Sequence, residues 1–206
     1  MKIKGPYAVL MTPFDGETVD GEAFVKQIKR LNATDLSGYV VNGSTSEFIQ
    51  LSPDEQKRMV ELTALNKARD KKLVVSACTG NVTDTYRICC HAADVCPPYY
   101  FEYTVGEREK YFKKIADISP LPVILYNIPF FTQEIEMDVI YRLFEHKNII
   151  GIKDSSANMK RIEHMIEETR GKDVSVLTGT DDILFPALVG GVSGSMTALV
   201  RCVFHS

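Results

Sequence analysis

The chain has 206 residues, of which 45% are hydrophobic and 25% are charged, and its formal net charge is -3. This is the composition of an ordinary globular protein, and we expect one domain covering residues 1–206. Charges of both signs are mixed along the chain, which argues against a nucleic-acid partner. Because the apolar runs are too short for a signal peptide or a membrane span, we expect a cytoplasmic protein without a membrane partner.

Short apolar runs alternate along the chain with amphipathic helical patterns. Several of these runs are almost continuously apolar, which is typical of parallel strands buried on both faces. The predicted strands cover residues 7–11, 38–41, 72–77, 123–126, 149–153, 174–177 and 191–196.

Helical patterns fill the stretches between the predicted strands. The clearest covers residues 52–68, where Ser52 can cap the helix, Pro53 suits its first position and Glu55 completes a capping box. Asp20 can cap an earlier helix whose apolar stripe includes Phe24. The remaining predicted helices cover residues 83–93, 107–118, 136–145, 158–170 and 181–189.

This repeated alternation predicts an α/β fold with a parallel sheet. A count near eight favours a closed (β/α)8 TIM barrel, and no G-x-G-x-x-G follows the first strand to indicate a dinucleotide domain. The helix over 83–93 runs directly into Val95-Cys96-Pro97-Pro98, which leaves room for only a short fourth strand. The sequence also stops soon after the eighth strand. We therefore expect an apparently truncated barrel with a shortened fourth strand, lacking the eighth helix and the C-terminal helical extension.

The cysteines indicate reduced thiols. Five is an odd number, and their spacing fits neither a disulfide framework nor a paired zinc site. The histidines also lack metal-ligand spacing. The cysteines are Cys78, Cys89, Cys90, Cys96 and Cys202, and we interpret the adjacent pair as helix packing residues.

Lys153 ends the sixth predicted strand, and the carboxyl ends of barrel strands are where such folds carry their sites. It follows the apolar run 149–152, and lysine is rarely buried without a purpose. Desolvation favours a neutral amine, which is what a carbonyl substrate needs to form an imine. Position alone supports equally well an amine that reaches out of the barrel mouth or pairs with Asp154.

Two further strand ends carry polar groups. Tyr126 ends the fifth strand and needs a hydrogen-bonded relay to transfer protons, which Ser44 can supply. The turn Gly43-Ser44-Thr45 follows the second strand and offers hydroxyls and backbone N–H groups suited to a carboxylate. Taken singly, a core tyrosine and an ordinary turn explain these residues as well.

Together these segments resemble one family, the class I pyruvate-dependent aldolases and lyases, which include dihydrodipicolinate synthase and N-acetylneuraminate lyase. The resemblance runs through the whole chain, from Thr12-Pro13-Phe14 onward. Its most specific parts are Tyr126-Asn127-Ile128-Pro129 and Gly151-Ile152-Lys153-Asp154-Ser155.

The resemblance implies a role for each matched residue. Lys153 would form the Schiff base with the keto carbon of pyruvate, and Tyr126 would donate and accept protons. Ser44 would link Tyr126 to Tyr100, which in the family reaches in from a neighbouring subunit. Ser44 and Thr45 would hold the pyruvate carboxylate.

Other positions complete the implied site. Gly43 would begin the carboxylate-binding turn, and Gly179 and Asp181 would line the substrate side. Met196 matches a position whose backbone contacts pyruvate. The partners are then small molecules, pyruvate and an aldehyde or sugar acid, in a homodimer or homotetramer. No metal and no organic cofactor are implied, because the imine is the electron sink.

Three positions depart from the family pattern. Ser46 stands where the family usually has glycine, so we expect its side chain to crowd the turn or tune the pocket. Phe130-Phe131-Thr132 stands where synthases acting on aspartate semialdehyde carry an arginine, which argues against that activity. Ser44, in place of threonine, favours a sugar-acid lyase.

Two alternatives to a working lyase stay open. An apparently truncated barrel could be an inactive remnant, and a chain that binds pyruvate covalently without turnover would be a sensor. Trapping of the imine and assay of the product distinguish them.

Overall fold

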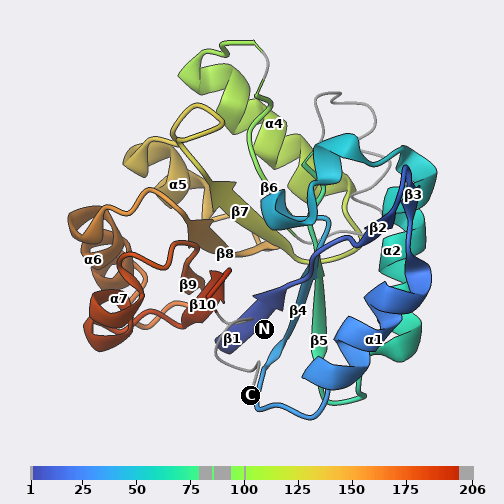
Figure 1. Cartoon of the computed structure of the whole chain (residues 1–206). Coiled ribbons are helices and arrows are strands. Elements are labelled where there is room, and N and C mark those ends of the chain that lie inside the picture. Colours follow the sequence, from blue (N-terminus) through green and yellow to red (C-terminus); the bar gives the residue numbers. More distant parts are fainter. Residues whose placement is uncertain (1, 79–84, 86–93, 100, 200–206) are drawn as a thin grey trace.

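The computed structural model describes residues 2–78, 85, 94–99 and 101–199. Within them, one eight-stranded sheet has the order β5-β4-β1-β10-β9-β8-β7-β6, and every pairing in it is parallel. The strands are β1 Gly5–Val9, β4 Gly38–Val41, β5 Lys72–Val75, β6 Asp94–Val95, β7 Val123–Asn127, β8 Ile149–Asp154, β9 Ser175–Thr178 and β10 Gly194–Thr197. The sheet curls as in a TIM barrel, which confirms the expected α/β class (Figure 1).

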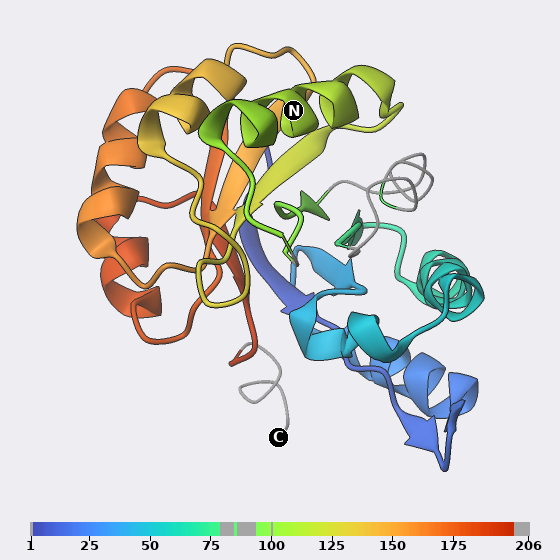
Figure 2. The same cartoon turned by 90° about the horizontal axis from the view of Figure 1, so that it is seen from above.

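Helices lie outside the curled sheet, as the view from above shows (Figure 2). They are α1 Gly21–Leu31, α2 Pro53–Asn66, α4 Val105–Ile118, α5 Met137–Leu143, α6 Met159–Glu168 and α7 Leu184–Gly190. Two short 3-10 turns, η1 Ser44–Ser46 and η2 Phe48–Gln50, follow β4, and a small antiparallel hairpin of β2 Phe14–Asp15 and β3 Thr18–Val19 follows β1. None of these helices is long and apolar enough to cross a lipid bilayer.

Capping side chains fix where several helices begin. Asp20 accepts a hydrogen bond from the backbone N–H of Ala23, and Ser52 forms the expected capping box with Glu55. Helix α4 begins two residues before the predicted start because Thr104 makes the same box with Glu107. These caps satisfy backbone N–H groups that the first turn of a helix leaves without partners.

Helix α7 begins three residues later than predicted. Its N-cap is Ile183, which contributes no side-chain cap, so the predicted helix start at residue 181 is wrong. The Asp181 carboxylate instead accepts a hydrogen bond from the backbone N–H of Leu199, at a distance of 3.0 Å. This contact links the loop after β9 to the segment after β10.

Two apolar layers sit on either side of the sheet. The outer layer lies between strands and helices and includes Phe24 and Phe112, while the inner layer fills the barrel with residues such as Tyr7 and Leu177. Six strands, β1, β4, β5, β7, β8 and β9, contribute to both layers, and these strands therefore carry the continuous apolar runs that the sequence showed.

Strands β5 and β6 stand at the two ends of the strand order. Strand β6 spans only Asp94–Val95, close to the short fourth strand that the sequence predicted. The helix expected over 83–93 lies outside the described residues, apart from the helical position of Thr85. The carboxyl ends of β5 and β6 border the pocket described below.

Candidate active site

Lys153 and Tyr126 form the centre of the site. They are register partners in the parallel pair β7 and β8, which places them side by side. Both are buried, with 3% and 4% of their surface exposed, so the lysine does not reach out of the barrel mouth. The Lys153 Nζ lies 3.9 Å from the centroid of the Tyr126 ring. A buried amine thus lies against the face of a phenol that belongs to the neighbouring strand.

Asp154 lies beside Lys153 in sequence, but its carboxylate has other partners. Arg161 Nε donates to Oδ2 at 2.9 Å, and Asn127 Nδ2 donates to the same oxygen at 2.8 Å. The backbone N–H of Ser156 donates to Oδ1 at 2.9 Å. Successive residues of a strand point to opposite faces, so this network stands behind the strand, away from Lys153.

The network also holds the loop that follows β7. The Asn127 side-chain oxygen accepts a hydrogen bond from the backbone N–H of Ile135, and Arg161 donates to the Ile135 carbonyl. Residues 128–135 are therefore fixed at both ends by the groups that hold Asp154. Asn127 follows Tyr126 in β7, so the same contacts hold the strand end that carries Tyr126.

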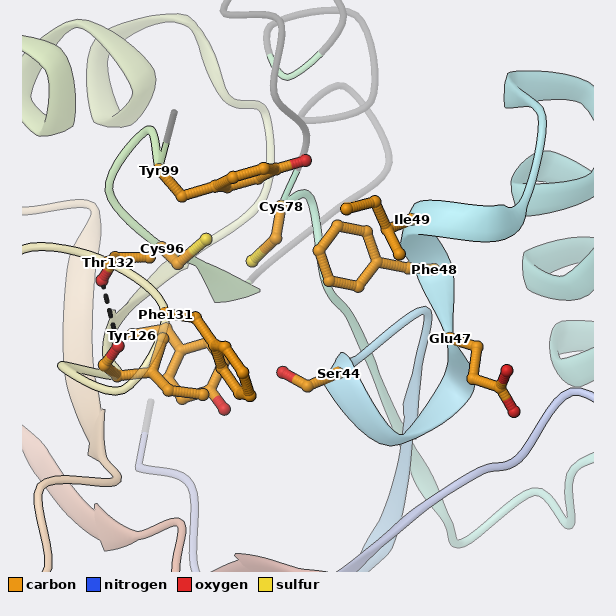
Figure 3. Close-up of a pocket in the computed structure, with 11 residues that line it drawn as sticks. Ser44, Glu47, Phe48, Ile49, Cys78, Cys96, Tyr99, Tyr126, Phe131 and Thr132 are labelled. Atoms are coloured by element: carbon orange, nitrogen blue, oxygen red, sulfur yellow. Dashed lines mark hydrogen bonds between the residues drawn. The ribbon is translucent and has the colours of Figure 1, made fainter. Parts of the chain in front are cut away.

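A pocket of about 290 Å³ opens beside Tyr126. Ser44 lines it from η1, and its hydroxyl points toward the rings of Tyr126 and Phe131 (Figure 3). Tyr99 lies on the opposite side from Ser44. The full lining consists of Ser44, Glu47, Phe48, Ile49, Cys78, Cys96, Tyr99, Tyr126, Ile128, Phe131 and Thr132. Ser44 and Tyr126, predicted from separate strand ends, thus meet at one pocket.

The pocket includes residues that the sequence reasoning did not select. Cys78 follows β5 and Cys96 follows β6, and both thiols pack with Tyr126 and Ile128 in a small buried cluster. The rule that sites lie at the carboxyl ends of barrel strands would have found both cysteines.

Gly179 fits against the stem of Lys153. A Cβ at this position would lie 2.9 Å from Lys153 Cε and would collide with Ser155 Oγ. Only glycine therefore allows the loop after β9 to pack against the lysine. Gly179 does not line the pocket beside Tyr126, and its expected place on the substrate side stays a prediction.

The remaining predicted residues lie at different depths. Met196 is buried in the barrel interior as the register partner of Tyr7 in β1. Thr45 is half-buried in η1, Gly43 is buried just before it, and the Asp181 side chain is exposed. The locations of these four residues do not test their predicted roles, which stay proposals.

Tyr100, expected to reach in from a neighbouring subunit, lies outside the described residues. Its roles as relay and as subunit contact therefore stay predictions.

Ser46 does not crowd the pocket. It is 1% exposed, and its hydroxyl donates to the Leu10 carbonyl at 2.5 Å. Its own carbonyl accepts a hydrogen bond from the Thr12 hydroxyl at 2.8 Å. The side chain that departs from the family pattern thus fastens η1 to the end of β1, and it does not line the pocket.

Two buried hydroxyl groups at the ends of β8 and β10 also lack partners within the described chain, and the first, that of Ser155, lies beside the Lys153 stem. Ser155 Oγ and Thr197 Oγ1 have no hydrogen-bond partner among the described residues, and both residues are nearly inaccessible. Such groups are costly unless something polar satisfies them. A small polar ligand near Lys153 would supply partners.

A TIM-barrel-like fold with a buried lysine at the end of its sixth strand is what the resemblance to the class I aldolases and lyases implies. The sequence profile of the Dihydrodipicolinate synthetase family matches residues 2–205, and the chain belongs to that family. This confirms the resemblance seen in the sequence.

Individual relatives agree. The chain is 31% identical to the 4-hydroxy-tetrahydrodipicolinate synthase of Methanothrix thermoacetophila, covering 96% of this chain and 70% of the relative. It is 30% identical to the N-acetylneuraminate lyase of Rhizobium meliloti, covering 95% and 68%. At the level of the family, the chain is a pyruvate-dependent lyase or aldolase.

The fold comparison gives the same result. The structure of YagE from E. coli K12, a prophage protein of the dihydrodipicolinic acid synthase family solved in complex with pyruvate, matches with a TM-score of 0.90. Sequence identity is 28%, and the match covers 96% of this chain and 70% of YagE. The TIM-barrel-like arrangement is therefore shared with a pyruvate-binding relative.

Proposed function

We propose that the protein is a Schiff-base lyase or aldolase that makes or breaks a carbon–carbon bond between pyruvate and an aldehyde. The observation that carries this proposal is Lys153, a lysine 3% exposed at a barrel strand end, with its Nζ over the Tyr126 ring. Desolvation favours the neutral form of an amine, and a neutral amine is nucleophilic toward a keto carbon.

The chemistry follows from this pair. The Lys153 amine adds to the keto carbon of pyruvate, and loss of water leaves an imine. Loss of a proton from the adjacent methyl group gives an enamine, whose carbon attacks the aldehyde carbon. Tyr126 transfers the proton that the new hydroxyl requires, and hydrolysis of the imine releases the product. The imine withdraws the electrons, so no metal or organic cofactor is called for.

Other predicted residues would position pyruvate and relay protons. Ser44 and Thr45 would hold its carboxylate in the turn that begins at Gly43. The buried Ser155 hydroxyl, which lies beside the lysine stem, would add a further hydrogen bond. Tyr100 from a second subunit would complete the relay through Ser44, which requires a homodimer or homotetramer.

The outer side of the site would come from β9 and β10. Gly179 would keep the lysine stem in place, and Asp181 would line the substrate side while it holds the backbone of Leu199. The Met196 backbone would contact pyruvate.

Borohydride reduction in the presence of pyruvate tests the proposal. We expect a covalent adduct of a reduced pyruvyl group, mapped by peptide mass spectrometry to Lys153. The Lys153→Arg variant should give none. The matched control is Lys71→Arg, because Lys71 is another buried lysine, 8% exposed, whose Nζ donates to the Thr34 carbonyl. A folded protein that forms no adduct, or forms it on another lysine, would refute the proposal.

A second candidate is a protein with the same barrel fold that no longer catalyses the reaction. It is favoured by β6, which has only two residues and ends beside the pocket. Displacements of about 1 Å can reduce a rate by about a hundredfold. A Lys153 adduct without any aldehyde-dependent product would support a pyruvate-binding protein without turnover, and a folded chain without an adduct would support an inactive remnant.

A further inference from the structure

The pocket beside Tyr126 has mainly apolar walls. Phe48 and Ile49 approach from η2, Ile128 and Phe131 from the loop after β7, and Cys96 from the end of β6. Phe48 also meets Tyr99 edge to face, with ring centroids 6.4 Å apart. Apart from the Tyr99 hydroxyl, these side chains offer an aldehyde substituent mainly carbon and sulfur surfaces.

No cation lines this pocket within the described part of the chain. Glu47 is its one charged lining residue there, and its carboxylate points away from the other side chains (Figure 3). A carboxylate on the aldehyde would lose its hydrogen bonds to water without gaining an ion pair with a guanidinium or an ammonium group. Burying such an unpaired charge is costly. An anionic aldehyde therefore fits these walls poorly.

A polyhydroxylated aldehyde fits little better. The Thr132 hydroxyl donates within its own turn, to the Ile128 carbonyl at 3.2 Å, as the dashed line in Figure 3 shows. Ser44 and Tyr126 are already assigned to pyruvate and to proton transfer. The hydroxyl groups of a sugar would thus lose hydrogen bonds to water and regain few.

We propose that the aldehyde partner is uncharged and apolar, about the size of a single aromatic ring with its formyl group. The pocket of about 290 Å³ lies just below the usual range of ligand sites, roughly 300–1,000 Å³, which suits a small substrate. Phe131 is the residue that selects this substrate, because its ring is 69% exposed at the rim and a bound ring would cover it. The inference rests on the proposed function, whose site it extends.

The experiment compares three aldehydes with pyruvate as the common partner: benzaldehyde, D-glyceraldehyde and succinic semialdehyde. We expect kcat/KM for benzaldehyde to exceed that for either of the others by about tenfold or more. Equal or better use of succinic semialdehyde or D-glyceraldehyde would overturn the inference. Trapping of the Lys153 adduct in the same samples separates failure of the inference from failure of the proposed function.

A matched pair of variants tests the selecting residue. Phe131→Arg should lower the ratio of benzaldehyde to succinic semialdehyde turnover by about tenfold or more, since it removes an apolar wall and adds a cation. Phe130→Arg changes the neighbouring ring, which is 67% exposed and does not line the pocket, and should leave the ratio unchanged. The same shift in both variants would contradict the assignment.

Binding of an unreactive probe tests the same pocket even if the protein does not catalyse the reaction. Benzyl alcohol should bind the unmodified protein, bind Phe130→Arg equally well, and bind Phe131→Arg about tenfold more weakly. Glycerol, the polar counterpart, should bind none of them. Equal binding of benzyl alcohol to all three proteins, or binding to none, would overturn the inference whether or not the adduct forms.

Discussion

Arg161 Nε donates to the Asp154 carboxylate at 2.9 Å, and Asp154 is fully buried directly after Lys153. The pair joins the first turn of α6 to the end of β8. It therefore supports, from behind the strand, the position of the lysine.

Replacing Arg161 by methionine should destabilise the protein strongly. Removing one partner of a buried ion pair leaves the other charge uncompensated and typically costs about 3–5 kcal/mol. The free energy of unfolding in urea measures the loss. Arg170→Met is the control, because Arg170 pairs with Glu167 at the exposed surface and should change stability by only about 0.5 kcal/mol. Equal losses of unfolding free energy in both variants would show that the buried pair contributes no more to stability than the exposed pair.

Gly179→Ala should reduce activity more than stability. The new Cβ would press on the Lys153 stem, and a displacement of the amine by about 1 Å is expected to lower kcat about a hundredfold. The measurements are kcat and the rate of adduct formation. Gly106→Ala is the control, because that glycine lies in the first turn of α4 with open space around it and should gain up to about 1 kcal/mol in stability. A fully active Gly179→Ala enzyme would contradict the argument.

Tyr126→Phe should separate imine formation from turnover. The phenylalanine ring keeps the surface on which the Lys153 amine rests, so the borohydride adduct should still form. Loss of the hydroxyl should lower kcat by about 10²–10⁴-fold, the usual contribution of a proton-transferring side chain. Tyr141→Phe, at a half-buried tyrosine of α5, should leave kcat unchanged. Unimpaired turnover in Tyr126→Phe would remove Tyr126 from the mechanism.

The contact between α4 and α5 should make stability depend on pH in acid. Hydrogen bonds from Arg142 and then Lys113 lower the pKa of Glu109 from 4.5 to about 2. A carboxyl whose pKa falls on folding stabilises the protein above its unfolded pKa and loses that contribution as the pH falls through its folded pKa.

Glu109→Gln should therefore cost about 1 kcal/mol at neutral pH, a value suited to a partly exposed network. The difference from the unmodified protein should shrink as the pH falls from 4.5 toward about 2, the range between the two pKa values of Glu109. Unfolding in urea at several pH values measures it. Glu163→Gln, at an exposed position of α6, is the control. A difference that grows on acidification would contradict the assignment.

Local patterns predicted most elements of this fold, because the information lies within each segment. The Ser52 capping box and the continuous apolar run before Lys153 both need only neighbouring residues. The hairpin of β2 and β3 was missed since two-residue strands carry no periodicity, although Asp15-Gly16 is a turn signal.

Contacts between distant segments were not predictable in the same way. Nothing in the sequence says that Asp154 takes Arg161 as its partner rather than Lys153, since both cations lie within reach along the chain. The start of α7 was misplaced for a similar reason, because Asp181 holds Leu199, a residue 18 positions away. The convergence of Ser44 and Tyr126 at one pocket was foreseen through the rule for barrel strand ends and through the family resemblance, and not from local patterns.

The pairing of β7 with β8 has one more consequence. Tyr126 lies opposite Lys153, and Asn127 lies opposite Asp154, so the reactive pair and the supporting pair alternate along the same two strands. A slip of one residue in β8 would turn the lysine outward and place an aspartate inside the barrel. The hydrogen bond between Asn127 and Asp154 therefore helps to fix the register of the two strands. An insertion or deletion of a single residue in either strand would put the supporting residues where the reactive residues now lie.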